Sequence, residues 1–201
     1  MDQDGLLKDT IRYDLKGNYS TDIYTDRAVE LIRGSRQQGS HNTSTRGTPQ
    51  QHPWFIYLAY TAPHLKYQAP KDKQHQYAQH MVISSKRRRL YASMISVLDE
   101  GVGRVVDVLD EVGVRENTVI VFASDNGAPI GEGAGSNYPF KGGKKSFYEG
   151  GVRSVSFVNS PLLHKTGYVN RNIHHVVDWF PTFEYLASGG MDHEPTESLI
   201  G

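Results

Sequence analysis

Apolar residues recur at helical spacing in two segments of the chain. In residues 21–33 they fall on one helical face, which predicts a short amphipathic helix: Tyr24, Ala28, Leu31 and Ile32. Residues 90–112 keep the same spacing for longer and predict the main helix: Leu90, Met94, Leu98, Val102, Val105, Leu109 and Val112. Gly113 follows directly and predicts the end of this helix, because glycine readily adopts the left-handed conformation of a C-terminal cap.

Three continuous apolar runs have the length of strands: WFIYLAY (residues 54–60), TVIVFAS (118–124) and VRSVSFV (152–158). Aromatic and β-branched residues, the short length and the flanking Pro53 favour a buried strand for the first run, and the other two are interpreted as a second and a third. A last helix is predicted after Asp178, which can cap it, with Pro181 tolerated in the first turn. Strands alternating with helices predict an α/β domain with a mostly parallel sheet flanked by helices.

Composition narrows the class of protein. The 201 residues are 37% hydrophobic and 22% charged, which is typical of a globular chain with one substantial core. Lys plus Arg equals Asp plus Glu, 22 each, so no overall field attracts nucleic acid or an anionic membrane. The basic run Lys86–Arg89 is interpreted as a solvated entry to the main helix, and residues 34–53, which are almost entirely polar, as a mobile surface loop.

No stretch reaches the ~20 apolar residues that a membrane span requires. The N-terminus, MDQDGLLKD, lacks the pattern of a signal peptide. Two glycosylation acceptor patterns, at Asn18 and Asn42, nevertheless support a secretory route. Cysteine is absent, which excludes disulfides, thiolate metal sites and a cysteine nucleophile within this sequence.

Polar residues follow two of the predicted strands. The sequence Thr61-Ala62-Pro63-His64 follows the first, and Asp125-Asn126-Gly127 follows the second. In a parallel sheet, ligands bind beyond the carboxyl ends of the strands. Asp125 and Asn126 offer oxygen ligands for calcium or magnesium, although two are too few and the tripeptide is also good turn sequence. His64 could donate a proton or bind an anion, or be an ordinary hydrogen-bonded loop residue.

The stretch GAPIGEGAGSNYPFKGGKKSFYEGG, residues 127–151, is here named the glycine-rich loop. It carries Lys141, Lys144 and Lys145, whose ammonium groups could approach an anion closely. The loop lacks the Gly-Lys-Ser/Thr of a phosphate-binding P-loop. It is either a flexible basic surface loop or part of a site for phosphoryl or sulfuryl transfer, with an anion held between a divalent cation, a lysine and a histidine.

Four motifs in order resemble the type I, formylglycine-dependent sulfatases, and most closely the arylsulfatase B, I and J group: TAPH at 61–64, SDNG at 124–127, PFKGGKKSFYEGGVR at 139–153 and DWFPT at 178–182. The helix YASMISVLDEGVGRVVDVLDEVG between the first two also fits this pattern. The resemblance covers nearly all of residues 16–189 apart from the polar loop. It implies an alkaline-phosphatase-like α/β sandwich, of which this chain is an incomplete part, and a single catalytic domain containing residues 1–201.

The resemblance also implies roles for individual residues. Asp125 and Asn126 correspond to two calcium ligands. Lys144 corresponds to the lysine that binds the sulfate group, and His64 to the histidine that contacts sulfate and protonates the leaving oxygen. Lys141 and Lys145 are interpreted as neighbours of the site. Architectural roles are expected for Glu149, Gly150, Gly151 and Arg153, which hold the loop against the sheet. Asp178 is expected to be a helix cap and Trp179 a packing residue.

The sequence also departs from the family pattern. Type I sulfatases make formylglycine within a C/S-x-P-x-R motif, and neither version occurs in these 201 residues. The aspartate pair that completes the calcium site in the family has no counterpart either, because Asp2 and Asp4 lack its context. Family members continue beyond DWFPT into a smaller C-terminal sheet, which is largely absent from this sequence.

Three functional hypotheses follow. In the first, the chain is part of a longer sulfuric ester hydrolase that uses calcium and acts on sulfated glycans or aryl sulfates, with the N-acetylgalactosamine 4-sulfatases as an example. Such an enzyme would be lysosomal or secreted. In the second, it is a catalytically inactive product that binds sulfated glycans or a partner. The third is a related phosphohydrolase, suggested only by the pair His174–His175, whose alternative role is to precede the last helix.

Overall fold

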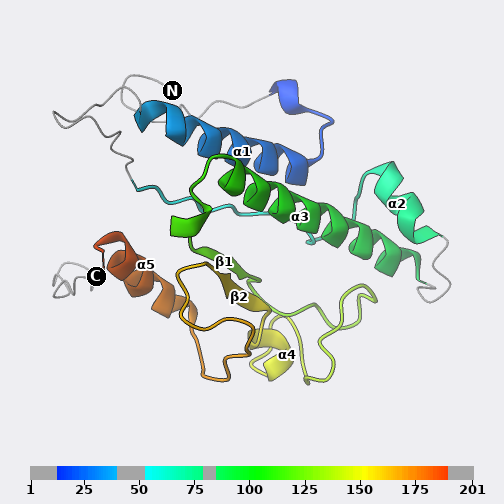
Figure 1. The fold of residues 1–201 in the computed structure, drawn as a ribbon. Helices are drawn as coiled ribbons and strands as arrows, with labels where there is room; N and C mark the ends of the chain where they lie inside the picture. The colour runs from blue at the N-terminus through cyan, green and yellow to red at the C-terminus, as the bar shows by residue number, and fades with distance from the viewer. Residues whose placement is uncertain (1–12, 40–52, 79–84, 190–201) are drawn as a thin grey trace, which may run out of the picture. The chain divides into compact units, whose positions relative to one another are not determined.

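The computed structural model describes residues 13–39, 53–78 and 85–189. The chain divides into two compact units, which are described separately. The larger unit comprises Met1–Gln51 and Ile56–Leu162, and the smaller comprises His52–Phe55 and Leu163–Gly201. The larger unit contains η1 (Tyr13–Leu15), α1 (Ser20–Gly39), α2 (Lys71–Ala78), α3 (Lys86–Glu111), η2 (Arg115–Asn117), β1 (Ile120–Ala123), α4 (Glu149–Val152) and β2 (Ser156–Asn159) (Figure 1). The smaller unit contains η3 (Val176–Asp178) and α5 (Trp179–Ala187).

The predicted main helix is confirmed as α3, which begins at Lys86 and ends at Glu111. Ser85 caps its first turn by accepting a hydrogen bond from Arg88 N. Gly113, with φ of 71°, lies two residues beyond the last helical residue, as the stop signal predicts. The basic run therefore opens the helix, and the predicted apolar face turns inward, with Met94, Leu98 and Leu109 all buried.

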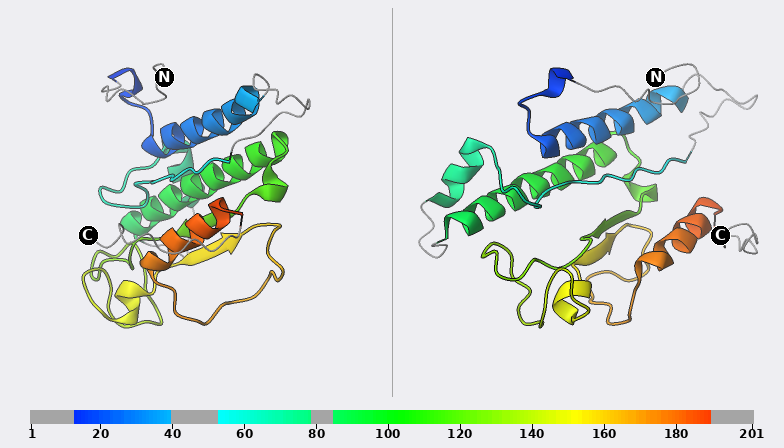
Figure 2. Two further views of the ribbon diagram at one scale, coloured as in Figure 1. Left: turned by 90° about the vertical axis from the view of Figure 1, so that its left-hand side faces the viewer. Right: turned by 180° about the vertical axis from the view of Figure 1, so that it is seen from behind.

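Helix α1 packs along α3, as the two views of Figure 2 also show. It is longer than predicted and includes residues 34–39 of the expected polar loop, while residues 40–52 lie outside the described part. The predicted face is only partly correct, because Tyr24 is 38% exposed whereas Thr21 and Thr25 are buried. Thr25 can occupy the interface because its hydroxyl donates to Thr21 O at 2.8 Å, whereas the buried Thr21 Oγ1 has no hydrogen-bond partner among the described residues.

The interface between α1 and α3 holds the main hydrophobic cluster of the described residues. It consists of Val29, Ile32, Val108, Leu109 and Val112. At its rim, the guanidinium of Arg33 donates two hydrogen bonds to the carboxylate of Glu111, at 3.0 and 2.6 Å. This contact lowers the pKa of Glu111, although the pair is exposed and an exposed ion pair contributes little to stability.

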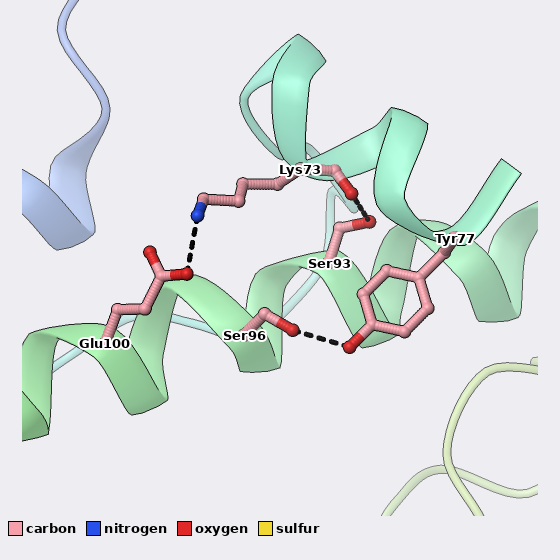
Figure 3. A network of polar contacts seen from close by, with 5 residues as sticks. All are labelled: Lys73, Tyr77, Ser93, Ser96 and Glu100. Atoms are coloured by element: carbon pink, nitrogen blue, oxygen red, sulfur yellow. Dashed lines mark hydrogen bonds and ion pairs between the residues drawn. The ribbon is translucent and has the colours of Figure 1, made fainter.

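Polar contacts join α2 to α3, as Figure 3 shows. The ammonium of Lys73 lies 2.5 Å from the carboxylate of Glu100, and Ser93 Oγ donates to the carbonyl of Lys73 at 3.2 Å. The Tyr77 hydroxyl lies 2.6 Å from Ser96 Oγ. Since α2 has few apolar residues, polar contacts such as these help to attach it to α3.

The sheet differs from the prediction. Strands β1 and β2 confirm two of the predicted strands, but they pair antiparallel, with Phe122 opposite Phe157 and their rings stacked 5.0 Å apart. Between them the chain contains only the four-residue helix α4, whereas a parallel pair needs a long crossover connection, usually a helix. The expected burial is also wrong for β2, whose four residues are all exposed.

The predicted strand at residues 54–60 is wrong, because these residues are extended but pair with no strand of the described chain. Within the larger unit, Ile56 packs against the cluster between α1 and α3. The Tyr60 hydroxyl lies 2.7 Å from Thr25 Oγ1. Ile56 and Tyr60 therefore contact the pair of helices α1 and α3, and not a neighbouring strand.

The smaller unit confirms the last helix and corrects its cap. Asp178 makes no side-chain capping bond to α5. Its carboxylate instead accepts a hydrogen bond from His175 N at 2.7 Å, which closes the preceding turn η3. Trp179 packs as expected, with its ring stacked 5.6 Å from Phe183, which also contacts Phe55. His174 and His175 lie at this turn, in keeping with the structural alternative for the pair.

No helix within the described ranges is long and apolar enough to cross a membrane. Of the two glycosylation patterns, Asn18 is exposed in the bend that precedes α1. Asn42 lies outside the described residues.

Candidate functional site

The turn that carries His64 is held by a contact before it, to helix α1, and by a contact after it, to the glycine-rich loop. The His64 backbone N–H donates to Thr61 O at 2.9 Å and closes the turn. Before it, Tyr60 reaches buried Thr25 on α1 at a point where Gly101 of α3 has no side chain. A Cβ at Gly101 would lie 2.6 Å from Thr25 Oγ1. Burial raises the pKa of Tyr60, so the phenol stays protonated and can serve as a donor over the physiological range.

After the turn, a second contact leads to the glycine-rich loop. The Tyr67 hydroxyl donates to the Glu132 carboxylate at 3.1 Å. The pKa of Tyr67 is raised by burial first and by this hydrogen bond second. Arg87 and Arg88, at the start of α3, donate to the carbonyls of Glu132 and Ala134 at 2.8 and 3.1 Å. The basic run is thus more than a solvated helix entry, since two of its arginines hold the loop.

Glycines let the loop fold back on the turn that follows β1. The Gly127 N–H donates to Gly151 O at 2.9 Å, and a Cβ at Gly127 would lie 1.7 Å from Gly150 O. A Cβ at Gly143 would lie 2.4 Å from Ala128 O. No side chain fits at either position, so the glycines that predicted a special loop are required by close contact between backbone segments.

The side chain of Asn137 joins three backbone groups inside this loop. Its Oδ1 accepts from Ala128 N at 2.8 Å, and its Nδ2 donates to Ala128 O at 2.8 Å and to Gly142 O at 3.0 Å. Ala128 O also accepts from Lys144 N at 3.1 Å. Reasoning from the sequence missed Asn137; the signal present was an Asn beside a Tyr-Pro pair in a loop rich in glycine.

His64 and Lys144, which are 80 positions apart in the sequence, meet at this place. Lys144 Nζ lies 3.4 Å from His64 Nε2. On the other side of the ring, Nδ1 lies 2.9 Å from Leu65 O. A carbonyl can only accept, so Nδ1 carries a proton, and in the neutral ring Nε2 presents its lone pair to the Lys144 ammonium. Neither side chain forms an ion pair with a carboxylate in the part of the chain that is described.

The two predicted calcium ligands, Asp125 and Asn126, lie in the turn after β1. Asp125 is exposed and Asn126 partly buried in the turn after β1, where Asn126 Nδ2 donates to Gly127 O at 3.0 Å. Among the described residues no group of three or more His, Cys, Asp or Glu side chains could hold a metal ion. The two side chains have the hard oxygen atoms that calcium prefers, but they are too few to hold it without further ligands.

The two other lysines of the loop face different surroundings. Lys141 Nζ lies 4.4 Å from the centre of the Tyr148 ring, and Lys145 is exposed with φ of 74°. Glu149 and Arg153 form an ion pair at 3.2 Å across α4. Gly150 and Gly151 are buried where the loop returns to the turn after β1. The architectural interpretation of this segment agrees with these contacts.

Comparison with known proteins identifies the family. The model of the family named Sulfatase matches residues 2–189. The chain is 39% identical over 178 residues to Arylsulfatase J of Mus musculus, covering 89% of this chain and 27% of that protein. It is 31% identical over 170 residues to N-acetylgalactosamine-6-sulfatase of Homo sapiens, covering 83% of this chain and 28% of that protein.

Solved structures give the same result for the fold. The crystal structure of Ps i-CgsB in complex with k-i-k-neocarrahexaose aligns with a TM-score of 0.76 and 33% identity, covering 91% of this chain and 37% of that one. A putative sulfatase from Bacteroides fragilis shares the fold at a TM-score of 0.53 and 21% identity, over 71% of this chain.

The chain therefore belongs to the sulfatase family, as the motifs predicted. It spans little more than a quarter of the two curated relatives described above. Its fold corresponds to part of the α/β sulfatase fold, since the alignment with Ps i-CgsB covers 37% of that protein.

Proposed function

We propose that the protein containing this chain is a sulfuric ester hydrolase, and that this chain supplies part of its sulfate-binding site. One observation carries the proposal: Lys144 Nζ and His64 Nε2 converge to 3.4 Å. An ammonium and an imidazolium at this distance would repel each other. The contact is favourable when the imidazole is neutral or when an anion binds between the two groups. Membership of the sulfatase family supports a sulfate ester as the anion.

The proposed roles follow from the chemistry of the two side chains. Lys144 attracts the sulfate oxygens as a compact positive charge. His64 contacts the sulfate through Nε2, while the contact of Nδ1 with Leu65 O fixes the orientation of its ring. The S–O bond to the alcohol breaks as a nucleophile from another part of the protein forms a bond to sulfur. The electron pair of the broken bond remains on the leaving oxygen, and His64, doubly protonated beside the bound anion, donates its Nε2 proton there. This transfer would leave the ring neutral, with its lone pair again directed at Lys144.

Calcium is part of the proposal through Asp125 and Asn126. These residues would hold the ion by their side-chain oxygens, together with ligands from other parts of the protein. When bound, calcium would supply positive charge that offsets the charge of the sulfuryl oxygens. Asp125 is exposed in the turn after β1, so it is open to such a ligand.

The proposed substrate class is a sulfated glycan, or an aryl sulfate in an assay. Two relatives are named as an arylsulfatase and an N-acetylgalactosamine-6-sulfatase, and Ps i-CgsB was solved in complex with k-i-k-neocarrahexaose. N-acetylgalactosamine 4-sulfate and 6-sulfate are therefore the first two substrates to compare. We propose a lysosomal or secreted location, for which exposed Asn18 is a suitable glycosylation site.

A second function is favoured by the absence of a C/S-x-P-x-R motif from the 201 residues. Without that source of a nucleophile, this chain alone would bind a sulfate ester and not cleave it. The binding surface would be the same pair, His64 and Lys144, so anion binding is common to both functions and is tested first.

The test is a titration of the 201-residue chain with inorganic sulfate, followed by the NMR signals of the His64 ring and by calorimetry. We expect Lys144→Ala to weaken sulfate binding about tenfold or more, the size of a lost hydrogen bond to a charged group. Lys141→Ala is the matched control: it removes an equal charge from the same loop, but that ammonium lies over the Tyr148 ring. Equal affinities for sulfate in the Lys144→Ala variant and the wild-type chain would refute the assignment.

A further inference from the structure

The amide of Asn137 joins the turn after β1 to the part of the glycine-rich loop that precedes Lys144. It contacts Ala128 on one side and Gly142 on the other. The next backbone bond, from Lys144 N to Ala128 O, fixes the residue whose ammonium reaches His64. A continuous series of contacts thus leads from Asn137 through the Ala128 peptide to Lys144.

The orientation of this amide follows from its partners. A backbone N–H can only donate, so the atom that faces Ala128 N is Oδ1. Backbone carbonyls can only accept, so the atom that faces Ala128 O and Gly142 O is Nδ2. Asn137 therefore uses one acceptor and both donors of its amide at once. A carboxylate of the same shape would keep the acceptor and direct negative charge at two carbonyl oxygens.

The surroundings leave no room for the loop to adjust around a poor substitute. A Cβ at Gly143 would lie 2.8 Å from Asn137 Nδ2 and 2.9 Å from Ile130 Cγ1. Gly143 is buried, and its own N–H donates to Ser146 Oγ at 3.1 Å. The amide is thus packed directly against the backbone of the residue that precedes Lys144, and a displacement of one moves the other.

We infer that Asn137 is a positioning residue for the anion site: its amide holds the backbone of Lys144 where the ammonium meets His64. The inference rests on the proposed sulfate site for its functional meaning, but the position of Lys144 can be measured without any ligand. Asn137 itself contacts neither His64 nor Lys144 through its side chain in the hydrogen bonds of the described residues. Its effect on an anion is therefore indirect.

The first variant is Asn137→Asp, which keeps the shape and removes both donated hydrogen bonds. At pH 7 we expect sulfate affinity to fall about tenfold and the nuclear Overhauser effect between Lys144 and His64 side-chain protons to be lost. At pH 4.5 the carboxyl, pressed against carbonyls, is protonated and donates one of the missing bonds. The ratio of wild-type to variant affinity should then move back toward one.

Asn137→Ala is the second variant and guards against a general structural effect. It cannot regain a donor at any pH, so its affinity ratio to the wild-type chain should stay constant between pH 7 and pH 4.5. Ser136→Ala is the matched control, because Ser136 Oγ only accepts a bond from Tyr138 N nearby, at 3.3 Å. We expect that control to bind sulfate like the wild-type chain.

The outcomes separate the inference from the proposed function. If wild-type chain binds no sulfate but the Lys144–His64 signal disappears in both Asn137 variants, the function fails and the positioning role stands. If the signal persists in both variants with backbone spectra unchanged at α1 and α3, the positioning role is overturned. It is also overturned if Asn137→Asp and Asn137→Ala show the same dependence on pH.

Discussion

At the scale of single residues, the candidate site is made of backbone segments that approach more closely than side chains allow. Gly127, Gly143, Gly150 and Gly151 all have a backbone oxygen of another residue within 2.4 Å of the position where a Cβ would stand. Real Cβ atoms do not come so near to an oxygen. The loop can therefore hold Lys144 against the turn after β1 only with glycine at these positions.

Replacement of Gly127 by alanine should destabilise the larger unit by about 1–3 kcal/mol or more, because the added methyl overlaps Gly150 O at 1.7 Å. Urea denaturation followed by circular dichroism would measure the change. Gly103→Ala is the control: Gly103 lies in α3 with nothing within 4 Å of its Cβ position. There we expect a gain of about 0.5–1 kcal/mol from helix propensity. The prediction fails if both substitutions have the same sign.

At the scale of elements, α3 organises the larger unit. Its apolar face packs on α1, its polar residues hold α2, and the arginines of its first turn hold the glycine-rich loop. The segment before the His64 turn contacts the same pair of helices, through the hydrogen bond between Tyr60 and Thr25. The two residues of the proposed anion site are thus brought together by elements that both depend on the packing of α1 against α3.

Leu109→Ala should cost about 2–5 kcal/mol in the free energy of unfolding, because Leu109 is 1% exposed in the central cluster. The contact between Lys144 and His64 should weaken in step with global unfolding as denaturant is added. Ile95→Ala serves as the control within α3, since Ile95 is 38% exposed and should cost less than about 1 kcal/mol. Equal losses in the two variants would show that α3 does not carry the core.

At the scale of the whole molecule, the described residues leave much apolar surface uncovered. In β2 and just before it, Val155, Phe157 and Val158 are 68%, 46% and 39% exposed. The strand edges of β1 and β2 are available for further pairing, since the sheet of the described residues has two strands. Large exposed apolar patches mark places where other protein surface binds. This agrees with a chain that spans 27% of Arylsulfatase J and 37% of Ps i-CgsB.

If the proposed hydrolase function holds, the native protein captured with an antibody to residues 139–153 should contain upstream peptides with formylglycine in a C/S-x-P-x-R context. Mass spectrometry of a proteolytic digest would detect them. The same material should hydrolyse an aryl sulfate, lose activity in a calcium chelator and regain it with added calcium. A mature protein that begins at Met1 and is inactive would favour the function of binding without cleavage.

Much of the fold and part of the site could be predicted from the sequence. Helix α3 could be predicted because seven apolar residues keep one period over more than six turns, and because Gly113 marks its end. His64 and Lys144 could be proposed because their motifs resemble one family, but nothing in the spacing places them together. The strand predicted at residues 54–60 is wrong, since an apolar run indicates an extended or buried segment and does not identify its partner.

The sequence by itself determined the elements that depend on local periodicity, the presence of a loop rich in glycine, and the family to which the chain belongs. The tertiary structure alone decided the antiparallel pairing of β1 with β2, the close backbone contacts that require glycine in the loop, and the roles of Asn137, Arg87 and Arg88 in holding the loop. The reason is physical: a hydrogen bond between residues far apart in the chain depends on where packing brings both partners. No local pattern around either residue carries that information.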